Sequence, residues 1–158
     1  MVCKKKSAIF ILFLGILLIT TVLLASSDND PFSEYKINSH EDVAAFLLEL
    51  GWECDIQEIS EQTSMIPEQF DTVLSDYNSL QLQQGCDLTK YAGKEITIYT
   101  VPILNYSDSK ENVYATIIVH KSRIIGGDIH SADLNGFMHT LCKLTQYLVY
   151  FTCKAINY

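Results

Sequence analysis

Three β-rich runs dominate the second half of the chain and constrain its fold more than any other feature. Residues 94–106 (KEITIYTVPILNY), 113–121 (VYATIIVHK) and 124–131 (IIGGDIHS) are rich in the β-branched and aromatic residues that strands favour. The connections between them, SDSKEN and SR, are short and polar. Consecutive strands joined in this way pair antiparallel, so the sequence predicts a meander. Pro102 indicates that the first strand lies at a sheet edge or carries a bulge there.

An amphipathic helix is predicted over residues 39–51. Ser39 is a suitable N-cap, and Gly51 stands where a helix commonly ends. Apolar residues recur at the spacing i, i+3, i+4, i+7, which places them on one side of a helix. These residues are Val43, Phe46, Leu47 and Leu50.

The segments between this helix and the meander predict a strand, a second helix and a single turn. Residues 52–60 (WECDIQEIS) alternate apolar and polar side chains, as an edge strand with one buried face does. The second helix is predicted from Pro67, in its first turn, to Gly85. Residues 86–93 (CDLTKYAG) predict one further helical turn. The inward side of the second helix is expected to consist of Phe70, Val73, Leu74, Tyr77, Leu80 and Gln81.

A final helix is predicted over residues 133–158. It is very apolar, but lysines and a glutamine interrupt it, so a core helix is favoured over a second membrane span. Docking of this helix on a partner is the alternative. The order is then helix, strand, helix, three strands, helix. Such an order predicts an α+β fold, an antiparallel sheet of three to four strands with helices packed on one face.

The first 25 residues differ in composition from the rest and are expected to lie outside this domain. Residues 1–7 form a basic stub, and residues 8–25 are apolar or nearly so and carry no charge. Eighteen such residues in a helix just reach across a bilayer core of about 30 Å. Residues 26–38 are polar and read as a tether to a domain over residues 39–158.

The apolar run predicts a cell-membrane location with the following domain outside the cytoplasm. Three lysines precede it, and basic residues favour the cytoplasmic side of a membrane. An uncleaved signal anchor is favoured by the length of the run, because cleaved signal peptides usually have a shorter apolar core. The alternative is cleavage near Ser27, which would release the domain as a secreted protein.

Charge restricts the class of partner. All 19 acidic residues but only eight of the 11 basic residues follow Ala25, so that part carries a net charge of −11. Phosphate backbones repel such a surface, so nucleic acid is not expected as a partner. An envelope protein or a small cationic ligand fits this charge better, in addition to the membrane that the N-terminal helix would enter. No cofactor is expected.

The cysteines leave the disulfide state open. Cys3 would lie on the cytoplasmic side, whereas Cys54, Cys86, Cys142 and Cys153 would be exported and allow three complete pairings. Two cysteines eleven residues apart on one helix are about 16 Å apart and cannot bridge, which argues against pairing the last two. A disulfide between Cys54 and Cys86 is therefore the pairing to test. The alternative is that each cysteine is a small buried apolar residue.

Several stretches together resemble a known family. They are FLLELGWE, then IPEQFDTVLSDYNSLQLQQGCDLTKYAGKEITIYTVPILNY, then VYATIIVHKSRIIGGDIHSADLNGFMHTL. In order and spacing they are similar to the domain-of-unknown-function family numbered 4830, from about Ala44 to Leu141. The resemblance implies a membrane-anchored, exported domain of Gram-positive bacteria and implies no activity. The last stretch, from Cys142 to Tyr158, departs from the family pattern, which puts the role of the last two cysteines in doubt.

The stretch RIIGGDIHSADLNGFMH (123–139) contains the strongest candidate for chemistry. On a strand, Asp128 and His130 point to the same face, where they could hold a metal or share a proton. A third ligand would come from Asp133, from His139 or from elsewhere in the chain. The simpler interpretation is structural: the paired glycines permit a bulge or a close backbone approach, and a neighbouring Ser or Asp caps the next helix. We favour the structural interpretation.

A second candidate pair lies further along. His139 and Cys142 would be three residues apart on the final helix and could form a thiolate–imidazolium pair. The surrounding leucines favour a core position for the cysteine. No nucleophile elbow, P-loop, HExxH or EF-hand loop is present in the sequence.

These observations favour a non-enzymatic binding or interaction module at the cell envelope. The alternative is a small metal-dependent or hydrolytic enzyme that uses Asp128, His130 and His139, with Cys142 as a further candidate. A structural subunit that assembles through its terminal helix is a third hypothesis.

Overall fold

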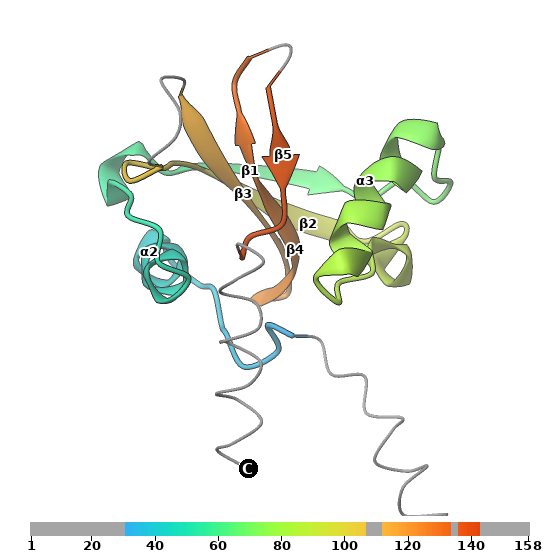
Figure 1. Cartoon of the computed structure of the whole chain (residues 1–158). Coiled ribbons are helices and arrows are strands. Elements are labelled where there is room, and N and C mark those ends of the chain that lie inside the picture. The colour runs from blue at the N-terminus through green and yellow to red at the C-terminus, as the bar shows by residue number, and fades with distance from the viewer. Residues whose placement is uncertain (1–30, 107–111, 134–135, 143–158) are drawn as a thin grey trace, which may run out of the picture.

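A five-stranded antiparallel sheet forms the centre of the molecule (Figure 1). The computed structural model describes residues 31–106, 112–133 and 136–142. Neighbouring strands follow the order of the chain, so the predicted meander is confirmed, with five strands in place of three to four. The strands are β1 (Ser60–Met65), β2 (Glu95–Pro102), β3 (Val113–His120), β4 (Arg123–Ser131) and β5 (Met138–His139). Helices α2 (His40–Glu49) and α3 (Thr72–Gln83) and the short 3-10 turns η1 (Ile56–Glu58) and η2 (Leu88–Tyr91) complete the α+β fold.

The hairpin between β3 and β4 determines where these strands pair. Lys121 and Ser122 form its turn with φ angles of 48° and 65°, which suits the twist of a two-residue hairpin. The register shifts between Ile118 and Val119, so the irregularity of the sheet lies in this hairpin. Pro102 is the last residue of an interior strand, past the start of β1, and there is no bulge at that position.

The segment after α2 does not form the expected strand. Residues 52–55 are irregular, and Asp55 caps η1 by accepting a hydrogen bond from the backbone of Gln57. The edge strand begins only at Ser60, and its sequence, SEQTSM, is polar and mostly exposed on both faces. The prediction was wrong because a strand without a buried face has no hydrophobic alternation to reveal it.

The two helices cover opposite faces of the sheet, not one (Figure 1). Adjacent residues of a strand point to opposite faces, so Ile117 and Ile118 belong to different apolar clusters. The larger cluster contains the buried side of α2, and the smaller contains Leu88 of η2 and Phe70 before α3. An α2 N-cap at Ser39 and a positive φ at Gly51 confirm the first predicted helix.

Helix α3 is shorter than predicted, and its inward side matches the prediction only in part: Gln81 is fully buried as expected, whereas Val73 is not. Asp71 is its N-cap and accepts a hydrogen bond from the Leu74 backbone, so the segment after Pro67 is not yet helical. Val73, expected inside, is 77% exposed. The buried positions on and just after the helix are polar: Asn78, Gln81 and Gln84.

Two of these amides close the edge of β4. Gln81 Oε1 accepts from Gly127 N at 2.8 Å, and Gln84 Nε2 donates to Gly127 O at 2.7 Å. Gln84 Oε1 also accepts from Leu141 N at 3.1 Å. If the short pairing of β4 with β5 continued for two more residues beyond Ile129 and His139, it would place Gly127 opposite Leu141. The Gln84 amide therefore lies where a further backbone pair would otherwise be.

The end of the chain differs from the predicted final helix wherever the structure describes it. Residues 136–142 contain strand β5, and Trp52 Nε1 donates to Leu141 O at 2.7 Å. The remainder of that prediction, residues 143–158, lies outside the described residues, as do the predicted stub and membrane helix at residues 1–7 and 8–25. Within the described part of the chain, no helix is long and apolar enough to cross a membrane.

Candidate functional site

Asp128 and His130 meet on the α3 face of β4, as their spacing in the sequence indicates. His130 Nδ1 lies 2.7 Å from Asp128 Oδ1, and the Tyr77 hydroxyl of α3 donates to Asp128 Oδ2 at 2.6 Å. The Asp128 side chain is 2% exposed and that of His130 is 26% exposed. The Tyr114 ring stacks beside His130 with a centroid distance of 6.0 Å. A buried carboxylate with two partners thus orients a half-buried imidazole.

The hydrogen bonds among Tyr77, Asp128 and His130 determine what chemistry these three side chains can perform. Burial, and then the nearby Asp128 charge, raise the pKa of Tyr77 well above its ordinary value, so the tyrosine stays protonated and remains a donor. With the carboxylate as acceptor, His130 donates from Nδ1, and its Nε2 becomes the basic nitrogen. Such an imidazole could accept a proton or a hydrogen bond.

His139 does not join this pair. It faces the opposite side of the sheet, because it pairs with Ile129 and not with its neighbour His130. There Tyr106 Oη lies 3.2 Å from His139 Nε2, and the rings of Trp52 and Phe137 lie close by. The three residues of the predicted enzyme site are therefore divided between two faces.

The candidate thiol at Cys142 is buried and follows a strand, so the predicted helical pairing with His139 is wrong. Burial raises the pKa of the Cys142 thiol to about 11, which makes it a poor nucleophile at neutral pH. Asp133, the other suggested third ligand, is exposed. Among the residues that the structure describes, no three histidines, cysteines or acids are grouped so that they could hold a metal.

Cys54 and Cys86 are both free thiols in the structure, so the suggested disulfide is not present. Cys86 is 2% exposed in the larger core cluster. Cys54 is half-buried, and burial, followed by the charge of Asp55, raises the pKa of its thiol. Both therefore resemble the alternative, small apolar side chains.

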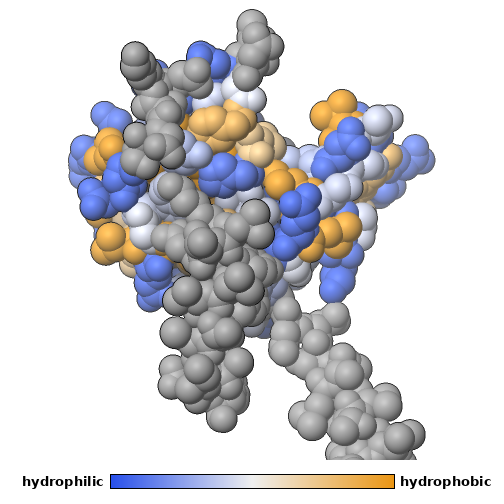
Figure 2. All heavy atoms as spheres, in the orientation of Figure 1, coloured by the Kyte–Doolittle hydropathy of each residue, from blue (hydrophilic) through white to orange (hydrophobic). Residues whose placement is uncertain are grey.

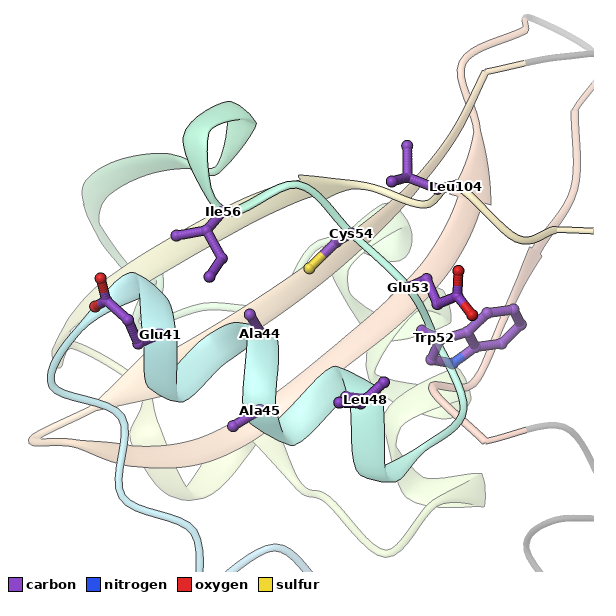
Figure 3. A pocket seen from close by; sticks show the side chains of 9 residues that line it. All are labelled: Glu41, Ala44, Ala45, Leu48, Trp52, Glu53, Cys54, Ile56 and Leu104. Atoms are coloured by element: carbon purple, nitrogen blue, oxygen red, sulfur yellow. The ribbon is translucent and has the colours of Figure 1, made fainter.

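An open groove lies between α2 and residues 52–56, beside Cys54 (Figure 3). Its volume is about 460 Å³. Leu48 is 64% exposed, Leu104 63% and Ile56 36%, so the groove presents large apolar side chains to solvent. Its full lining is Glu41, Ala44, Ala45, Leu48, Trp52, Glu53, Cys54, Ile56 and Leu104.

Carboxylates flank the apolar surface of the groove. Figure 3 shows Glu41 beside Ile56 at one end and Glu53 near Trp52 at the other. Hydrogen bonds from its own backbone and from the Ser39 hydroxyl lower the pKa of Glu41, so that carboxylate is ionised at neutral pH. A groove of this kind suits a ligand that combines apolar groups with positive charge.

The groove was not predicted from the sequence. One signal for it was available, because Leu48 lies outside the apolar side of the first helix, next to Leu47, where a solvent-facing helix usually carries polar residues. A single exposed leucine is common, however, and carries little information. The other apolar residues of the groove come from irregular segments that have no period.

Helix α3 offers a useful contrast, because it also exposes apolar side chains, among hydrophilic ones (Figure 2). Val73 is 77% exposed and Leu82 is 54% exposed. Neither lines the groove beside α2.

Comparison with known proteins gives one family. A family described as a domain of unknown function (DUF4830) matches residues 46–129, more than half of the chain. No curated protein and no solved structure matches the chain. The matched range includes the end of α2, the irregular wall of the groove and strands β1 to β3.

Proposed function

We propose that this chain, which belongs to the DUF4830 family, is a non-enzymatic interaction module of the cell envelope that holds a polypeptide partner in the groove beside α2. Residues 8–25 would anchor it in the membrane as a single span, with the domain outside the cytoplasm. In Gram-positive bacteria, that arrangement would display the groove toward other envelope proteins.

The observation that carries this proposal is the exposed apolar surface of the groove. Leu48 and Leu104 are each more than half exposed, although burial of an apolar side chain is favourable by about 25 cal/mol per Å². Grouped apolar residues on an otherwise charged surface commonly mark a binding site. A partner that inserted an apolar side chain over Ala44 and Cys54 would also cover Leu48 and Leu104.

The charge of the groove favours a basic partner. Glu41 and Glu53 flank its apolar floor, and the chain after Ala25 has a net charge of −11. Long-range attraction would increase the association rate of a cationic segment, and this effect weakens as salt screens the charges. We therefore expect the bound segment to place lysine or arginine beside one or more apolar residues.

The proposal can be tested by cross-linking and pull-down of the tagged full-length chain from membranes. The double variant Glu41→Gln, Glu53→Gln should recover less partner than the unchanged chain. Glu68→Gln, Asp76→Asn is the matched control, because it removes two exposed charges away from the groove. An equal loss in both variants would show that only net charge matters, and an unchanged recovery in both would remove the groove from the interaction.

A second candidate function is supported by the buried hydrogen bonds of Asp128. A general base at His130, oriented by Asp128 without His139, would suit a small hydrolytic enzyme. The test is hydrolysis of a panel of ester and amide substrates by the full-length chain and by His130→Gln. Turnover that disappears in the variant would favour the enzyme, whereas no turnover in either protein would favour the interaction module.

A further inference from the structure

The backbone N–H and C=O groups of β1 point alternately toward β2 and away from it. The hydrogen bonds to β2 show which residues of β1 point their groups away. Directly after β1, Ile66 N–H donates to Lys94 O at 3.0 Å. Hydrogen-bonded and non-hydrogen-bonded pairs alternate along antiparallel strands, so every second residue counted back from Ile66 bonds to β2. The pairing of β2 with β3 is consistent with this assignment. Just after β2, Ile103 N–H donates to Val113 O at 2.9 Å. The β1 residues whose N–H and C=O groups point away from β2 are Glu61, Thr63 and Met65.

This outer edge is exposed and has none of three common protections, which are lysine, proline and a bulge. Five of the six residues of β1 are exposed, and β2 is the only strand paired with β1 in the described part of the chain. Edge strands are commonly protected by lysine, proline or a bulge, because their free backbone groups otherwise pair with other chains. The sequence SEQTSM contains neither residue, and its register with β2 is regular.

On the opposite side of the sheet, backbone groups of β4 that point away from β3 do have partners. β4 is followed by β5 at one end and bridged by Lys36 at Arg123 at the other. Between them the Gln81 and Gln84 amides bond Gly127. Three different devices thus contact β4 on the side away from β3, whereas no described strand pairs with the outer side of β1.

We propose that the open edge of β1 accepts an extended segment of the partner as a sixth, antiparallel strand. The inference rests on the proposed interaction function and adds how the partner backbone is held. Main-chain hydrogen bonds to an added strand supply affinity, and alternate side chains supply specificity. The three outward residues therefore define which side chains the partner should carry.

The side chains of these residues point to the α2 face, and each would lie opposite one partner residue. Met65 is 62% exposed and would face an apolar side chain, and Thr63 would face a β-branched one. Glu61 is 49% exposed, with His40 Nε2 at 3.5 Å, and would face lysine or arginine. In antiparallel order the partner segment reads apolar, any, β-branched, any, basic.

A second copy of this chain fits the edge less well. Antiparallel pairing of two β1 strands about Thr63 would place Met65 of one copy opposite Glu61 of the other. The carboxylate would then face a thioether and not a cation. Two copies also carry the same strong negative charge, so a basic partner is the occupant that the charges favour.

The probe is the peptide acetyl-Gly-Leu-Ser-Val-Ser-Lys-Gly-amide, titrated into the isotope-labelled full-length chain in detergent micelles. We expect the amides of Glu61, Thr63 and Met65 to shift and to become protected from hydrogen exchange. The matched control replaces the peptide lysine with glutamate and should bind about tenfold more weakly. Glu61→Lys in the protein should reverse that preference.

Thr63→Pro tests the backbone part of the interaction. The Thr63 N–H points outward, so proline should leave the pairing with β2 intact and remove binding of the probe. A folded Thr63→Pro protein that binds the probe as tightly as the unchanged chain would overturn the inference. Shifts confined to residues around Leu48 would also overturn it, while leaving the groove and the proposed function in place. Protection of β1 that depends on protein concentration without the peptide would identify a second copy as the occupant.

Discussion

Helices α2 and α3 dock on opposite faces of one sheet by different physical means. Val43, Phe46 and Leu47 of α2 are at most 1% exposed and pack into the larger apolar cluster. The fully buried positions of α3 and its C-terminal turn are amides, which bond the backbone of β4 and the segment after α3. Apolar packing gains free energy with area and has no direction, whereas each amide must meet a particular partner atom.

The difference suggests separate roles for the two faces. Docking by apolar area is tolerant of small shifts, so α2 can form one wall of a groove without losing its position. Docking by hydrogen bonds positions α3 in a single arrangement, which also places the Tyr77 hydroxyl on Asp128. We therefore assign partner binding to the groove and the β1 edge, and structural specificity to the α3 face.

The largest expected effect is on α2. Phe46→Ala should lower the free energy of unfolding by about 3–5 kcal/mol, because it leaves a cavity in the larger cluster. Urea unfolding followed by the fluorescence of Trp52, the single tryptophan, would measure it. Leu48→Ala on the same helix is the control and should change stability by less than about 0.5 kcal/mol. Similar losses in both variants would mean that α2 is not docked by its apolar side.

The next effect concerns the amide between β4 and β5. Gln84→Ala should cost about 2–3 kcal/mol, because the buried Gly127 carbonyl and Leu141 N–H lose their partner. Hydrogen exchange at Leu141 should become faster, whereas the exposed neighbour Gln83, changed to alanine, should leave both measurements unaltered. Retained stability and slow exchange in Gln84→Ala would contradict the docking of α3 through directional bonds.

A smaller effect with a pH signature is expected at Tyr77. Tyr77→Phe removes one hydrogen bond from buried Asp128 and should cost about 1–2 kcal/mol at neutral pH. In the unchanged chain the folded state raises the pKa of Tyr77, mainly through burial. The unfolded state therefore loses its proton first as pH rises through about 10, and the contribution of Tyr77 to stability is complete below that pH and falls above it.

Above pH 10, the free energies of unfolding of the unchanged chain and of Tyr77→Phe should differ, and the difference measures the contribution of Tyr77. The unchanged chain should lose stability more steeply than Tyr77→Phe, by about 1.4 kcal/mol per pH unit. Parallel curves would show that Tyr77 ionises as readily in the folded state as in the unfolded state.

The smallest effect on stability is expected from modification of Cys54. Its half-buried thiol should react with iodoacetamide at pH 8 before Cys86 and Cys142, which are both 2% exposed. Mass spectrometry of the folded protein would give the order of labelling, with urea-unfolded protein as the control. A mass two units lower in a peptide pair linking Cys54 to Cys86 would contradict the free thiols of the structure.

The same contrast explains how much could be predicted from the sequence. The buried side of α2 is apolar at helical spacing, so that helix, its N-cap and its end at Gly51 were predicted and are confirmed. The period of two also predicted that Asp128 and His130 share a face. Where burial is polar the same method succeeded only in part: Gln81 was expected inside and is fully buried, but Gln84 was assigned to no inward face and Val73 was wrongly expected inside.

Other failures have equally local causes. A strand as polar as β1 gives no hydrophobic signal, so the edge strand was expected eight residues too early. His139 was placed on a helix because the stretch around it is apolar, and strand pairing with Ile129 puts it on the other face instead. The groove depends on how an irregular segment packs beside α2, which no repeating pattern encodes.

Site-specific photo-cross-linking in living cells would show directly whether the α2 side of the molecule binds the partner. A photoreactive amino acid is placed at Leu48 in the full-length chain, or at Val73, an apolar position on α3 that is more exposed than Leu48. We expect a cross-link from Leu48 to one dominant envelope protein, through a segment that carries basic and apolar residues, and little from Val73. Equal products from both positions, or a dominant product from Val73 alone, would contradict the assignment of binding to the α2 side of the molecule.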